Sequence, residues 1–100
     1  VGHTHVPKIF QQDVEMRRFT TINPRAAEVV EANDTSRLII NPGSVGQPRD
    51  GDPRASYGMF DTDRGAFELR RVTYNVPSTQ DQILKAGLPK ELADRLELGL

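Results

Sequence analysis

The run Leu38-Ile39-Ile40, which ends at Asn41-Pro42-Gly43, constrains the fold of this chain more than any other segment. A short, uninterrupted apolar run that is bounded by turn residues is typical of a strand buried on both faces. We therefore predict a strand over Leu38 to Ile40 whose two faces are both covered by other parts of the protein.

Weaker patterns precede this run. The segment Lys8 to Gln12 is polar and only slightly periodic, and we expect a short edge strand there and a second short piece at Glu15 to Thr20. The segment Ala26 to Ala32 has the composition of a helix. Because it is short, it is expected to be a surface connection or a single helical turn.

Two clearer strands follow the apolar run. They are predicted at Ala55 to Asp61 and at Ala66 to Asn75, and the polar loop Thr62 to Gly65 between them is short enough for a hairpin. The two strands are therefore expected to pair antiparallel. Their larger apolar side chains are expected to lie in the core, namely Tyr57, Met59, Phe60 and Phe67.

The chain ends in two helical patterns. Ser78 and Asp81 have the spacing of a capping box, and the helix that they predict runs to Ala86. A second helix is predicted between Pro89 and Gly99, because proline suits the start of a helix and apolar residues recur there at helical spacing. No repeat or linker marks a domain boundary within the 100 residues.

The bulk composition excludes several classes of function. A net charge of -1 and a pI near 6.1 do not favour broad binding to nucleic acid or to an anionic membrane surface. The absence of cysteine excludes disulfides, thiolate metal sites and thiol catalysis. No apolar run approaches the ~20 residues that span a bilayer, and we expect a cytoplasmic protein without a membrane partner.

The two histidines of the chain, His3 and His5, lie one residue apart in the sequence Val-Gly-His-Thr-His-Val-Pro. Residues two apart in an extended segment point to the same face, and Gly2 allows the backbone to turn sharply beside them. Neutral imidazole is the commonest metal ligand, and such a pair can bind one ion or be shared between two ions. The alternative is that both histidines are solvated loop residues.

A polar turn follows the predicted strand and brings further candidates. Asn41 and Ser44 lie at the strand end, where polar side chains can hydrogen-bond the second nitrogen of a metal-bound histidine and so fix its tautomer and orientation. Taken alone, the sequence Asn-Pro-Gly-Ser is better explained as an ordinary turn.

Two arginines lie close to an acidic pair in the loop that comes next. Arg49 and Arg54 are candidate contacts for a substrate phosphate, since a guanidinium group matches two phosphate oxygens at once. Pairing of these arginines with Asp50 and Asp52 is equally consistent with the sequence.

Taken together, Gly2-His3-Thr4-His5, the segment from Asn41 to Gly46 and the pair Ser56-Tyr57 resemble the C-terminal part of the calcineurin-like metallophosphoesterases. The resemblance covers nearly all of the chain and is closest to small bacterial members. It implies an α/β fold, the C-terminal part of a four-layer αββα sandwich with mixed β-sheets, in which residues 1–100 are one portion of a single domain. The family's Asp-x-His, Gly-Asp-x-x-Asp and Gly-Asn-His motifs are absent and would have to precede Val1.

The same resemblance implies a metal-dependent phosphoesterase that hydrolyses phosphomonoesters, phosphodiesters or nucleotides at a dinuclear metal centre. His3 would ligate one divalent ion and His5 the other, with manganese favoured and iron, zinc or nickel as alternatives. The general acid and the bridging carboxylate would come from outside this chain, so no catalytic residue is assigned within it and the chain alone is expected to be inactive. The expected partner is a small phosphorylated substrate, and homo-oligomer formation stays open. If the histidines are incidental, the chain is instead a non-catalytic structural or interaction module.

Overall fold

The computed structural model describes all 100 residues, Val1–Leu100, and its first half forms a three-stranded sheet. The strands β1 (Lys8–Asp13), β2 (Arg18–Ile22) and β4 (Ser36–Asn41) have the order β2-β1-β4. β1 pairs antiparallel with both neighbours, and Ile9 lies opposite Ile22 on one side and Ile40 on the other. The predicted edge strand at Lys8 to Gln12 is therefore real, but it occupies the centre of its sheet.

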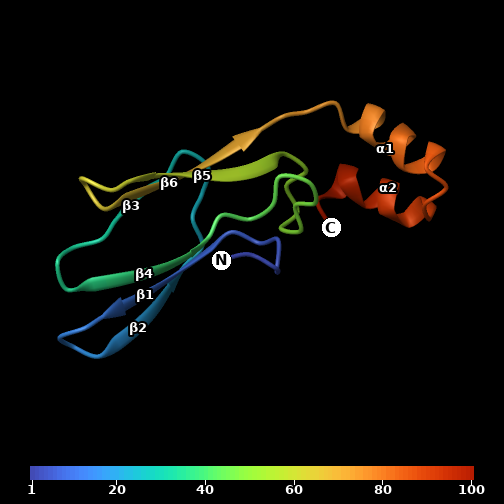
Figure 1. The fold of residues 1–100 in the computed structure, drawn as a ribbon. Helices are drawn as coiled ribbons and strands as arrows, with labels where there is room; N and C mark the ends of the chain where they lie inside the picture. The colour runs from blue at the N-terminus through green and yellow to red at the C-terminus, as the bar shows by residue number, and fades with distance from the viewer.

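The second sheet contains β3 (Val29–Glu31), β5 (Ala55–Asp61) and β6 (Ala66–Val72) in the order β3-β6-β5. The predicted antiparallel hairpin of β5 and β6 is confirmed, although β6 ends at Val72. The two sheets lie one above the other (Figure 1). Every strand pair within this chain is antiparallel, so mixed sheets would require strands from outside it.

The two helices, α1 (Val76–Lys85) and α2 (Lys90–Leu98), lie beyond one end of the sheets (Figure 1). α1 begins after Asn75, whose side-chain oxygen accepts a hydrogen bond from the backbone N–H of Ser78 at 3.0 Å. The prediction of Ser78 as the N-cap is therefore wrong, because Asn75 supplies the capping oxygen one turn earlier. α2 is followed by Gly99 in the left-handed conformation, which favours glycine. Neither helix has the length and apolar character needed to cross a membrane.

The core lies between the two sheets and is small. Ile9 of β1 packs with Phe67 and Leu69 of β6, and four partly buried side chains surround them: Ile22, Val30, Leu38 and Ile40. Only 12 of the 100 residues are buried, and the molecule measures 53 × 22 × 18 Å. Such a thin core is expected where two packed sheets have outer faces that the chain itself does not cover.

The strand predicted at Leu38 to Ile40 is confirmed as part of β4, and within these 100 residues only one of its two faces is covered. Ile39 is 56% exposed, whereas Leu38 and Ile40 pack toward the core. Successive side chains of a strand point to opposite faces, and only one face of β4 is covered by the second sheet. Ile39 lies opposite Phe10 of β1 on the open face of the sheet. The side chain of Phe10 is also exposed.

Two further predictions fail in the second sheet. Met59 and Phe60 are exposed rather than in the core, because β5 is an edge strand and its end lies beside a solvated turn. The ring of Phe67 is buried as predicted and lies against Gly58, where a side chain would clash with it. The segment Ala26 to Ala32 contains strand β3 instead of a helical turn, because its β-branched valines pair with the open edge of β6.

Candidate metal centre

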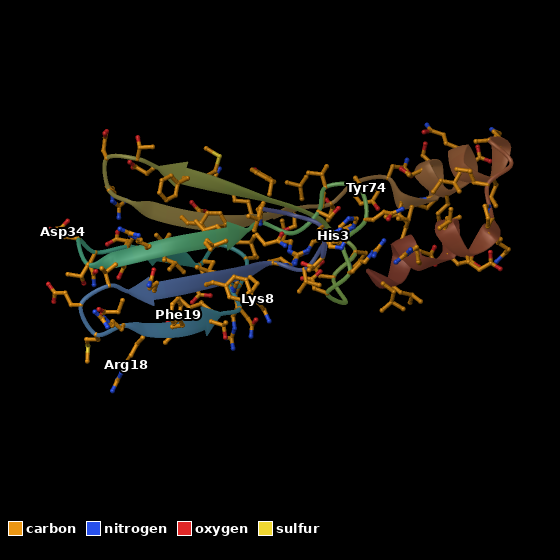
Figure 2. The ribbon with its side chains drawn as sticks, turned by 60° about the horizontal axis from the view of Figure 1, so that its bottom comes forward. His3, Lys8, Arg18, Phe19, Asp34 and Tyr74 are labelled. Atoms are coloured by element: carbon orange, nitrogen blue, oxygen red, sulfur yellow. The ribbon has the colours of Figure 1, made fainter.

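Figure 2 shows His3 at the junction between the sheets and the helices. His3 and His5 both have positive φ angles, 81° and 60°, a conformation that residues other than glycine rarely adopt. The segment before β1 is therefore bent, not extended as the spacing suggested. Strain of this kind persists only where the surrounding contacts hold it, and it concentrates at functional sites.

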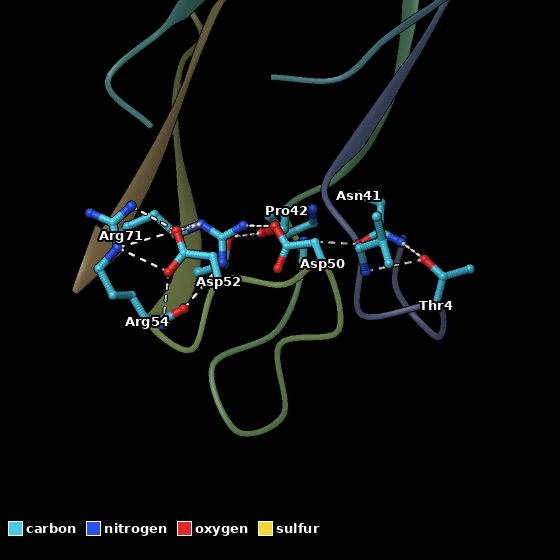
Figure 3. A network of polar contacts seen from close by, with 10 residues as sticks. Thr4, Asn41, Pro42, Asp50, Asp52, Arg54 and Arg71 are labelled. Carbon is cyan, nitrogen blue, oxygen red and sulfur yellow. Dashed lines mark hydrogen bonds and ion pairs between the residues drawn. The ribbon is translucent and has the colours of Figure 1, made fainter. Parts of the chain in front are cut away.

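Asn41, the last residue of β4, is hydrogen-bonded to the residue on each side of His3. Its side-chain amide donates to the carbonyl oxygen of Gly2 at 3.2 Å and to the Thr4 hydroxyl oxygen at 2.9 Å (Figure 3). Its side-chain oxygen accepts from the backbone N–H of Gly43 at 3.0 Å. Asn41 is only 4% exposed. Both its side-chain NH2 group and its side-chain oxygen are hydrogen-bonded, as is usual for a buried polar side chain.

The imidazole of His5 is oriented by a backbone carbonyl. Its Nδ1 lies 2.9 Å from the carbonyl oxygen of Gln47. A carbonyl oxygen only accepts, so Nδ1 carries the hydrogen and the lone pair of the neutral ring is on Nε2. The backbone N–H of Gln47 donates to the hydroxyl oxygen of Ser44 at 3.0 Å. Neither Asn41 nor Ser44 is hydrogen-bonded to an imidazole, and Ser44 is linked to His5 through Gln47.

The turn that carries Ser44 is fastened to the second sheet. The Ser56 hydroxyl of β5 donates to the carbonyl oxygen of Pro42 at 2.6 Å, and the Ser56 N–H donates to the carbonyl oxygen of Ser44 at 2.9 Å. Gly43 has a φ of 86°, and a Cβ atom there would lie 2.9 Å from Pro7 and from the Ser56 hydroxyl. Glycine is thus required at the point where the turn passes between the two sheets.

A network of ion pairs closes the loop after this turn (Figure 3). Arg54 pairs with Asp52 at 2.6 Å, and Arg71 of β6 pairs with Asp50 and lies 3.8 Å from Asp52. The side chain of Arg71 is only 5% exposed. The hydrogen bond from Arg54, with a smaller contribution from the charge of Arg71, lowers the pKa of Asp52 to about 2. Arg54 is therefore a structural partner of Asp52, whereas Arg49 makes no ion pair.

The helical pair attaches to the same loop. The backbone N–H of Gly51 donates to the carbonyl oxygen of Gly99 at 3.0 Å. Gly99 lies so close that a Cβ atom would come within 2.7 Å of the backbone of Asp52. The end of α2 thus packs directly on the loop that supplies the Gln47 carbonyl.

The chain holds part of a metal site. No group of three or more histidine, cysteine, aspartate or glutamate side chains is placed to bind an ion. Imidazole nitrogens are suitable ligands for a divalent metal, and the His5 tautomer leaves its Nε2 lone pair available. Two imidazoles alone are too few to complete a coordination sphere. Gln47 was not a sequence candidate, because its role uses a backbone carbonyl that every residue has.

The chain is similar to two known proteins. No protein-family model matches the chain. An uncharacterized protein of Methanocaldococcus jannaschii is 35% identical over 99 residues, which are 99% of this chain and 38% of that protein. A metallophosphoesterase from Sphaerobacter thermophilus, known from a crystal structure, matches 100% of this chain and 41% of its own length, with a TM-score of 0.90 and 46% identity. The chain thus spans 38% and 41% of the length of these two proteins. It is related to the calcineurin-like metallophosphoesterases and corresponds to a part of their fold.

Proposed function

We propose that this chain is part of a metal-dependent phosphoesterase in which His3 binds one divalent ion of a dinuclear centre and His5 binds the other. The relation to the Sphaerobacter thermophilus metallophosphoesterase supports the reaction class. Residues outside this chain would supply the remaining ligands and the general acid, since the chain has no third metal-binding side chain near the histidines.

The observation that carries this proposal is the 2.9 Å contact between His5 Nδ1 and the carbonyl oxygen of Gln47. A backbone carbonyl in this position is a common partner of metal-binding histidines, because it fixes the ring and leaves Nε2 free for the ion. The positive φ angles of His3 and His5 add to this support. When bound, divalent ions would supply a Lewis acid for the phosphate oxygens and a water that ionises near neutral pH.

The proposed substrates are small phosphomonoesters, phosphodiesters or nucleotides, and the proposed compartment is the cytoplasm. Imidazole combined with oxygen ligands suits manganese, iron, zinc or nickel. Manganese is the first metal to test.

The test uses a full-length protein that contains this chain. The manganese-loaded parent is expected to bind two ions and to hydrolyse p-nitrophenyl phosphate. His3→Ala and His5→Ala should each remove most of the activity and reduce the metal content, while the metal-free protein still unfolds cooperatively.

Metal analysis and the hydrolysis assay together distinguish this function from the non-catalytic alternative. A parent protein that binds no metal under manganese supplementation and hydrolyses nothing would favour a structural or interaction module. Activity that is unchanged in both histidine variants would refute the role of His3 and His5.

A further inference from the structure

The loop after β4 and the strand β6 contribute three arginines, Arg49, Arg54 and Arg71, and one of them has no carboxylate partner. Arg71 pairs with Asp50 and lies near Asp52, and Arg54 pairs with Asp52 (Figure 3). The two carboxylates therefore neutralise two of the three guanidinium groups. The positive charge that remains belongs to Arg49.

The backbone of Arg49 is tied to the histidine segment. Its N–H donates to the carbonyl oxygen of His5 at 3.2 Å. One guanidinium nitrogen donates to the side-chain oxygen of Gln47 at 3.2 Å, and the carbonyl of the same Gln47 orients the His5 ring. Arg49 is exposed, and its other guanidinium N–H groups have no partner within this chain.

We infer that Arg49 binds a second phosphate group of the substrate, adjacent to the phosphate that is hydrolysed. This inference rests on the function proposed above, in which metal ions hold the scissile phosphate. Arg49 has no carboxylate partner, and its backbone is hydrogen-bonded to the His5 carbonyl. Its guanidinium group suits a phosphate in the leaving group, because its planar fork matches two phosphate oxygens.

A nucleoside diphosphate illustrates the reaction. The oxygen of water bonds to the terminal phosphorus, the bond from this phosphorus to the bridging oxygen breaks, and the products are a nucleoside monophosphate and inorganic phosphate. The hydrogens of the water pass to the product phosphates and to solvent. Arg49 stabilises the negative charge that develops on the departing inner phosphate.

The test compares ADP, which has a second phosphate, with p-nitrophenyl phosphate, which has none, on the manganese-loaded full-length protein. Arg49→Gln should lower kcat/KM for ADP by about 10 to 100-fold, as expected for a lost charge-assisted hydrogen bond, and that for p-nitrophenyl phosphate by less than about 3-fold. Arg49→Lys keeps the charge without the planar fork and should have an intermediate effect.

A matched control and a binding measurement complete the design. Arg18→Gln removes the same charge at the end of the first sheet remote from His3 (Figure 2), and it should leave both substrates unaffected. Binding of AMP, the product that retains the inner phosphate, should weaken about 10-fold in Arg49→Gln when it is measured by isothermal titration calorimetry.

The possible outcomes separate the two hypotheses. Unchanged ADP hydrolysis in Arg49→Gln, equal losses for both substrates, or the same loss in Arg18→Gln would overturn the inference while the phosphoesterase function stands. A parent protein that hydrolyses neither substrate would refute the proposed function, and the role of Arg49 would be refuted with it.

Discussion

Replacement of Gly99 by alanine should detach the helical pair from the loop that orients His5. Gly99 has a φ of 65°, and a Cβ atom would lie 2.7 Å from two backbone atoms of Asp52. The left-handed conformation costs alanine about 1 to 2 kcal/mol. Crowding against the backbone of Asp52 adds about 1 to 3 kcal/mol. The free energy of local opening of α2 should therefore fall by about 2 to 5 kcal/mol.

Gly87 offers a matched control. Its φ is 74°, but nothing lies within 4 Å of a Cβ atom placed there, so Gly87→Ala should show only the conformational cost of about 1 to 2 kcal/mol. Amide hydrogen exchange of α2 in the full-length protein measures local opening for both variants. Equal protection of α2 in the two variants would refute the argument that contact with Asp52 holds the helices in place.

Two further substitutions test the loop itself. Ser44→Ala removes the acceptor of the Gln47 N–H and should weaken metal affinity about 10-fold, at the low end of the range for residues that support a ligand indirectly. Ser44→Thr should restore the affinity and Ser78→Ala should not change it in a metal titration; equal affinity in Ser44→Ala would mean that the turn is only structural. The pKa of Asp52 is lowered from 3.8 to about 2, so its ionised form stabilises the fold above about pH 4, and this contribution is lost as the pH falls toward 2. The difference in thermal midpoint between the parent and Asp52→Asn should shrink over that range, and a difference independent of pH would contradict the assignment.

Local patterns predicted the elements whose structure is decided locally. The β5–β6 hairpin was predicted with the correct start of each strand, because the polar turn at Thr62 to Gly65 brings the two strands together. The strand at Val29 to Glu31 was missed. It depends on which sheet edge is open, and that is set by pairing between distant segments.

In the candidate site, the sequence likewise indicated some of the residues and could not indicate others. Residue type and spacing indicated His3 and His5, but no side-chain signal could indicate the carbonyl of Gln47. The sequence left open whether Arg49 or Arg54 pairs with a carboxylate. The structure pairs Arg54 with Asp52, because the two side chains are two residues apart on a tight turn where both can reach.

The contacts that orient the histidines join residues far apart in the sequence. The pair His5 and Gln47 is separated by 42 positions, and the pair Thr4 and Asn41 by 37. Closing such long loops costs more chain entropy than closing the β5–β6 hairpin, so we expect these contacts to form after the hairpins during folding. On this expectation the imidazoles are organised late, and a partly folded chain would contain its hairpins before the two histidines are oriented to bind a metal. Metal ions added during refolding would stabilise the last step of assembly without directing the early ones.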